Sequence, residues 1–143
     1  MGAHSVLVDH GSVAPAVRER YPHGIDGVLD LVGNSALRDS LRSLRKGGRL
    51  CLAGFLGGDA PVEAFNPIVD MPSGVELNVF ASAFTFGTPE YPLARVPMQH
   101  IVDKVADGTY KAKPARVFPF ERLADAHRLV ESDAANGKIV VVL

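Results

Sequence analysis

Apolar and polar positions between residues 24 and 58 predict a strand, a helix and a second strand. Residues 25–32 are mostly apolar, and the run is short enough for a buried strand rather than a helix. Residues 50–53 repeat this apolar pattern. Between the two runs, leucines recur at the spacing of one helix face: Leu37, Leu41 and Leu44. A strand, a helix and a strand in this order form the unit from which parallel sheets are built.

Turn and cap residues mark both ends of this helix. Asn34 or Ser35 is placed to cap its first turn. Arg45 and Lys46 fall in the predicted last turn, where cations interact favourably with the helix dipole. The glycine pair at positions 47–48 is then expected to end the helix.

The rest of the chain continues this alternation of short strands and helices. Strand patterns cover residues 5–9, 75–83, 115–118 and 138–143, and helix patterns cover residues 13–21, 97–108 and 121–131. Residues 59–74 contain several prolines and are predicted to form a loop. The order of these elements predicts an α/β fold with a parallel sheet.

Composition excludes several classes of function. The 143 residues include 15 basic and 16 acidic side chains, so a nucleic-acid or anionic-membrane surface has no electrostatic basis. The single cysteine excludes an internal disulfide. Neither a membrane-spanning stretch nor a signal-peptide pattern is present, which predicts a soluble, cytoplasmic protein.

Residues suited to catalysis are scarce. The histidines are scattered without metal-ligand spacing, and Cys51 lies inside a predicted strand, where a buried inert thiol is expected. Asp30 ends the first strand of the central unit and is suited equally to ligand binding and to capping the next turn. Glycine-rich phosphate loops and the nucleophile motif G-x-S-x-G are absent from the sequence. We therefore predict neither a catalytic residue nor a metal site.

Loops follow three of the predicted strands, at residues 33–34, 54–58 and 81–84. Carboxyl ends of neighbouring parallel strands share one edge of a sheet, which is where ligands bind in such folds. Glycines in these loops would let the backbone approach a ligand closely. Ordinary turns explain the same spacing equally well.

Four stretches resemble the medium-chain dehydrogenase/reductase superfamily. GIDGVLDLVG and, after the helix, LRKGGRLCLAGFLGG are similar to the second half of its coenzyme domain. MGAHSVL resembles the third strand of that domain, and the tail, FPFERLADAHRLVES followed by NGKIVVVL, resembles the family's C-terminus. The similarity is strongest to the quinone oxidoreductase branch, which is often labelled zinc-binding dehydrogenase although it lacks zinc.

The resemblance implies a partial Rossmann-like dinucleotide-binding domain over residues 1–86. Residues 87–143 would be the C-terminal segment of the catalytic (substrate) domain. The implied activity is NAD(P)H-dependent hydride transfer to a small-molecule quinone or activated double bond, without zinc. The nicotinamide half of NADP or NAD would contact residues at the three strand ends: Leu31, Val32, Gly33, Gly54, Phe55, Leu56, Ala81, Ser82 and Ala83.

The family pattern also implies parts that this sequence does not contain. The phosphate-binding loop and most of the substrate pocket would precede Met1, so a truncated chain that is inactive or nearly so by itself is expected. The missing strands would expose the edge of residues 25–32. Either residues 5–9 pair against that edge or a second chain covers it, and a homodimer is expected.

Two alternatives remain open from the sequence. The stretch LRKGGRL also resembles the turn before a late strand in methyltransferase-like α/β domains, although no nucleotide-binding glycine loop accompanies it. The chain could also be a non-catalytic partner module of a split dehydrogenase.

Overall fold

The computed structural model describes residues 3–143, which divide into two compact units on either side of the bond between Val96 and Pro97. The first unit contains α1 (Ala14–Arg20), β1 (Ile25–Asp30), α2 (Leu37–Ser43), β2 (Leu44–Leu52), α3 (Pro67–Asp70), β3 (Glu76–Val79), α4 (Ser82–Thr85) and a 3₁₀ turn, Leu93–Arg95. The second contains α5 (Met98–Ala106), β4 (Arg116–Pro119), a 3₁₀ turn at Phe120–Arg122, α6 (Leu123–Glu131) and β5 (Ile139–Val142). Their assignment to coenzyme and substrate domains, with a boundary after residue 86, stays a prediction.

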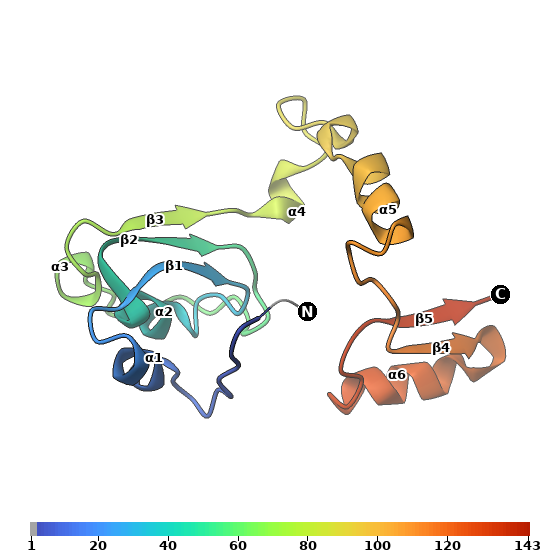
Figure 1. The fold of residues 1–143 in the computed structure, drawn as a ribbon, viewed down its shortest axis with the longest axis horizontal. Coiled ribbons are helices and arrows are strands. Elements are labelled where there is room, and N and C mark those ends of the chain that lie inside the picture. Colours follow the sequence, from blue (N-terminus) through green and yellow to red (C-terminus); the bar gives the residue numbers. More distant parts are fainter. Residues whose placement is uncertain (1–2) are drawn as a thin grey trace. The chain divides into compact units, whose positions relative to one another are not determined.

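The first unit is built on a parallel sheet with the strand order β1-β2-β3. In this register Leu29 lies opposite Cys51, and Cys51 lies opposite Asn78. Helix α2 packs on one face of the sheet, and α1 packs against α2 (Figure 1). The predicted α/β class and the strand–helix–strand unit at its centre are confirmed.

The core lies between α2 and the covered face of the sheet. Its buried members are the leucines of the helix and of β2: Leu37, Leu41, Leu44, Leu50 and Leu52. The side chains of Leu41 and Leu44 are fully buried, at 0% exposure. Val28 from β1 and Phe65 from the following loop pack against this cluster. Of the three leucines whose spacing predicted the helix face, Leu37 and Leu41 therefore mark the buried face of α2, and Leu44 is buried from β2.

The end of α2 differs from the prediction. The helix ends at Ser43, because Leu44 takes an extended conformation (φ −76°, ψ 145°) that buries its side chain and places it opposite Ile25. The ladder then jumps to the pair Gly27–Arg49, so residues 45–48 bulge out of β2. The prediction that Arg45 and Lys46 lie in the last helical turn is wrong, because burial of Leu44 outweighs continuation of the helix.

Residues 5–9 do not form the predicted strand. They have no strand partner among the described residues, and Val6 is 80% exposed. A strand is stable only when its N–H and C=O groups are paired, so β-branched composition alone does not produce one. The predicted pairing of this segment with β1 is wrong. Coverage of the β1 edge by a second chain stays a prediction.

In the second unit, α6 packs against a parallel pair formed by β4 and β5 (Figure 1). Phe118 and Ala126 are buried in this unit. The strand, helix and strand predicted for residues 115–143 are confirmed, as is a helix opened by Pro97. Across residues 3–143, none of the helices is long and apolar enough to cross a membrane.

Candidate functional site

The carboxyl ends of β1 and β2 are joined by backbone hydrogen bonds that continue past the strands. The Ala53 N–H donates to the Asp30 carbonyl at 2.8 Å, and the Gly57 N–H donates to the Val32 carbonyl at 2.7 Å. A third bond, from the Leu56 N–H to the Leu31 carbonyl, measures 3.3 Å. The first two predicted loops therefore lie side by side.

Glycines allow this close approach. A Cβ atom on Gly54 would overlap the Leu31 carbonyl oxygen. Gly33 has a positive φ of 96°, and a Cβ there would lie 2.6 Å from the Gly54 carbonyl oxygen. Both positions accept only glycine without backbone movement.

Asp30 holds the first loop in place. Its buried carboxylate accepts hydrogen bonds from the Val32 N–H (2.8 Å), the Gly33 N–H (2.9 Å) and the Ser40 hydroxyl (2.7 Å). Of the two roles considered for Asp30, capping of the turn is the one the contacts support. The predicted cap by Asn34 or Ser35 is wrong: α2 has no side-chain cap, and the Asn34 amide instead donates to the Ala60 carbonyl.

The third predicted loop begins at the same edge of the sheet. The Phe80 N–H donates to the Leu52 carbonyl at 2.9 Å, one residue beyond the end of β3. The predicted strand over residues 75–83 is thus shorter than expected, and Ser82 begins α4 instead of continuing the strand. Ala81 immediately precedes that helix and accepts a hydrogen bond from the Thr85 hydroxyl.

The site surface at this edge is mainly apolar. Exposed apolar side chains come from all three strand ends: Leu31, Val32, Phe55, Leu56, Phe80 and Phe84. The predicted contact residues include no titratable side chain, and their polar groups are backbone atoms and the Ser82 hydroxyl. Such a surface suits a flat, weakly polar ring, and none of the predicted contact residues offers a cation to a phosphate.

A metal ion does not fit the residues that the structure describes. Over residues 3–143, no group of three or more His, Cys, Asp and Glu side chains is arranged to hold one. Cys51 is partly buried, with its sulfur 3.9 Å from the Asn78 side-chain oxygen. We therefore assign no step to zinc.

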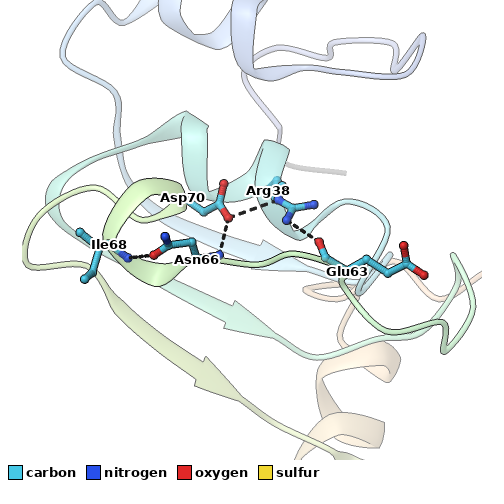
Figure 2. A network of polar contacts seen from close by, with 5 residues as sticks. All are labelled: Arg38, Glu63, Asn66, Ile68 and Asp70. Atoms are coloured by element: carbon cyan, nitrogen blue, oxygen red, sulfur yellow. Dashed lines mark hydrogen bonds and ion pairs between the residues drawn. The ribbon is translucent and has the colours of Figure 1, made fainter.

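A polar network fastens the loop that runs from β2 to β3 (Figure 2). Arg38 on α2 donates to the Glu63 carbonyl at 2.6 Å and lies 3.4 Å from the Asp70 carboxylate. Asp70 also accepts the Asn66 N–H at 2.8 Å, and Asn66 caps α3 through the Ile68 N–H. This network was not predicted from the sequence, although Asn66 before a proline is a helix-start signal.

Asp70 should make the attachment of this loop sensitive to acid. The Asn66 N–H, assisted by Arg38, lowers the pKa of Asp70 below its ordinary value of 3.8. An aspartate with a lowered pKa stabilises the fold above the unfolded-state pKa, and that contribution is lost as pH falls through the folded value. We expect slow hydrogen exchange of the Asn66 amide at pH 5–7, with the protection lost only as pH falls below the ordinary value of 3.8. The protection should be weakened at every pH in Asp70→Asn, because a neutral amide oxygen is a weaker acceptor than a carboxylate.

Glu63→Gln is the matched control for this prediction, because the Glu63 side chain points away from the network and only its carbonyl takes part (Figure 2). It should exchange like the unaltered protein across the same pH range. Equal protection in Asp70→Asn and Glu63→Gln would show that Asp70 does not fasten the loop.

Comparison with known proteins adds family information to this geometry. A family model described as zinc-binding dehydrogenase matches residues 1–141. Quinone oxidoreductase-like protein 2 of Rattus norvegicus is 28% identical over 149 aligned positions, which cover 99% of this chain and 40% of the rat protein. The chain therefore spans about two fifths of that relative's length.

Solved structures share the fold. The crystal structure of AibC superimposes with a TM-score of 0.73 at 25% identity, covering 99% of this chain and 37% of AibC. A mycobacterial protein solved in complex with NADPH gives a TM-score of 0.66 at 24% identity, covering 91% of this chain and 39% of that protein.

Proposed function

The chain belongs to the zinc-binding dehydrogenase family, and from that premise we propose that it serves hydride transfer between a nicotinamide cofactor and a small organic acceptor. The acceptor class we propose is a quinone or an activated carbon–carbon double bond. The similarity to a quinone oxidoreductase-like protein supports this class over the methyltransferase alternative.

The observation that carries the proposal is the shared edge formed by the ends of β1, β2 and β3. Ligands of open parallel sheets bind outside the carboxyl ends of the strands. Two of the three loops at this edge are locked together by backbone hydrogen bonds, which gives a preformed surface. The NADPH bound by a mycobacterial protein of the same fold is consistent with a nicotinamide ligand.

We propose that the loop residues position the nicotinamide ring and exclude water from one of its faces. The cofactor, when bound, supplies the hydride, and the protein contributes binding and orientation. Leu31 and Val32 would contact the ring from the end of β1, and Phe55 and Leu56 from the end of β2. Since none of the predicted contact residues has a side chain that ionises near neutral pH, we assign no general acid or base among them.

Binding of the two halves of the cofactor tests this assignment directly. Amide spectra of the ¹⁵N-labelled chain would be recorded with nicotinamide mononucleotide and, separately, with adenosine 2′,5′-bisphosphate. We expect the nicotinamide half to shift amides at residues 31–33, 54–56 and 81–83. The adenosine half should leave them unchanged, because none of the predicted contact residues carries a cation for its phosphates.

Phe55→Ala is the variant for this experiment, because the Phe55 ring is exposed at the edge and its loss leaves the core intact. We expect nicotinamide binding to weaken about three- to tenfold, as for loss of one aromatic contact. Ile68→Ala, an exposed apolar residue on α3, should bind like the unaltered chain. Shifts scattered away from the strand ends, or equal effects of the two variants, would contradict the proposal.

A further inference from the structure

A hollow lies at the opposite end of the first sheet from the candidate nicotinamide surface, beside the amino ends of β1 and β2. Its volume is about 560 Å³, and it is lined by Arg18, Pro22, His23, Leu44, Arg45, Lys46 and Pro72. Because the strands are parallel, this edge is a strand's length away from the candidate nicotinamide surface. The bulge at residues 45–48 forms one of its walls.

Backbone contacts hold this bulge in a defined position. The Gly47 N–H donates to the Ser73 carbonyl at 3.0 Å, and Gly47 has a positive φ of 68°. On the other side, a Cβ on Gly24 would lie 2.5 Å from the Arg45 nitrogen, so the turn before β1 packs directly on the bulge. Bulges of this kind often re-aim side chains toward a site.

The arginines of the pocket are oriented mainly by backbone carbonyls. Arg18 donates to the carbonyls of Arg42 (2.8 Å), Leu44 (2.7 Å) and Pro22 (3.3 Å). These bonds fix the guanidinium at the C-terminal end of α2 without neutralising its charge. A guanidinium has five donors, so two remain for a ligand.

Arg45 is fixed in a similar way. Its Nε donates to the Asp26 carboxylate at 2.6 Å, and one terminal nitrogen donates to the Lys46 carbonyl at 2.7 Å. Among the pocket-lining residues and their ion-pair partner, Arg18, Arg45 and Lys46 are cations and Asp26 is the single carboxylate. This local excess of positive charge contrasts with a net charge of −1 for the whole chain.

We propose that this pocket binds a small, multiply charged oxyanion of the phosphate class. Oriented guanidinium groups match the geometry of phosphate oxygens, and a compact ammonium group adds a point charge. An excess of more than one positive charge favours a dianion over a simple carboxylate. The site is independent of the proposed nicotinamide surface, because it lies at the other edge of the sheet and shares no residue with it.

The experiment is a titration of the ¹⁵N-labelled full chain with inorganic phosphate and with pyrophosphate, at ionic strength held constant with sodium chloride. We expect saturable shifts at Gly24 and residues 45–48, with pyrophosphate binding more tightly than phosphate. Residues 31–33 and 54–56 should not shift. Nicotinamide binding and phosphate binding are thereby read at separate amides, so failure of either assignment is distinguishable from failure of the other.

Lys46→Gln is the variant of choice, because it removes one charge and leaves a polar, unbranched side chain that is one atom shorter. We expect phosphate binding to weaken about tenfold, as for loss of one hydrogen bond to a charged group. Lys113→Gln, an exposed lysine of the second unit, is the matched control and should bind like the unaltered chain. The backbone spectrum of each variant reports whether it is folded.

Non-saturable shifts, the same shifts with chloride alone, or equal loss in Lys46→Gln and Lys113→Gln would overturn the proposal. Saturable binding that is weakened in Lys46→Gln alone would support it.

Discussion

Replacement of Gly54 by alanine is expected to separate the ends of β1 and β2 and to destabilise the first unit. The added methyl group would overlap the Leu31 carbonyl oxygen, which belongs to backbone and cannot rotate away. We expect the free energy of unfolding to fall by about 3 kcal/mol or more, at or beyond the upper end of ordinary overpacking. Chemical denaturation measures this change.

Gly27→Ala is the matched control, because a Cβ on Gly27 would be 3.7 Å from the nearest atom, the Arg49 carbonyl oxygen, at ordinary contact distance. Gly54→Ala should also abolish the amide shifts that the nicotinamide half of the cofactor is expected to cause. Equal stability of the two variants would show that the loops at this edge separate easily, and the preformed surface would then have no basis.

Replacement of Leu41 by alanine is expected to lower the free energy of unfolding of the first unit by about 2–5 kcal/mol. Leu41 is fully buried between α2 and the sheet, and its loss leaves a cavity among the core leucines. Urea denaturation, followed by circular dichroism, measures this loss.

The same change at Leu56 is the control, because that side chain is 84% exposed and its removal should change stability by less than about 0.5 kcal/mol. A Leu41→Ala protein as stable as Leu56→Ala would mean that the leucine cluster does not hold the unit together.

The carboxyl ends and the amino ends of the strands in the first sheet form two different surfaces. At the carboxyl edge, Gly33 and Gly54 let backbones touch and leave an apolar surface without charge. At the amino edge, the bulge after Leu44 brings fixed cations over an open pocket. We therefore assign an uncharged ring to one edge and an oxyanion to the other.

The pattern of apolar and turn residues was sufficient to predict several helices and strands. Leu37 and Leu41 of α2 are buried as predicted, and β1 and the terminal strand–helix–strand form where the pattern predicts them. Their burial is lower than predicted, because β1 has no buried apolar side chain, Leu29 is 66% exposed and β5 is only half-buried. The order of strands and loops likewise placed the predicted contact residues at one edge, since parallel strands carry their carboxyl ends together.

Other features depended on contacts between residues distant in sequence. Residues 5–9 have strand composition but no strand partner within residues 3–143, and backbone groups without partners do not form a ladder. Arg45 and Lys46 follow a helical pattern, yet the pairing of Leu44 with Ile25 ends the helix before them. The sequence by itself therefore determined the family resemblance, the element order and the core of α2. Only the tertiary structure decided the bulge, the Arg38–Asp70 network and the cationic pocket, because each is made by atoms that the chain brings together from separate segments.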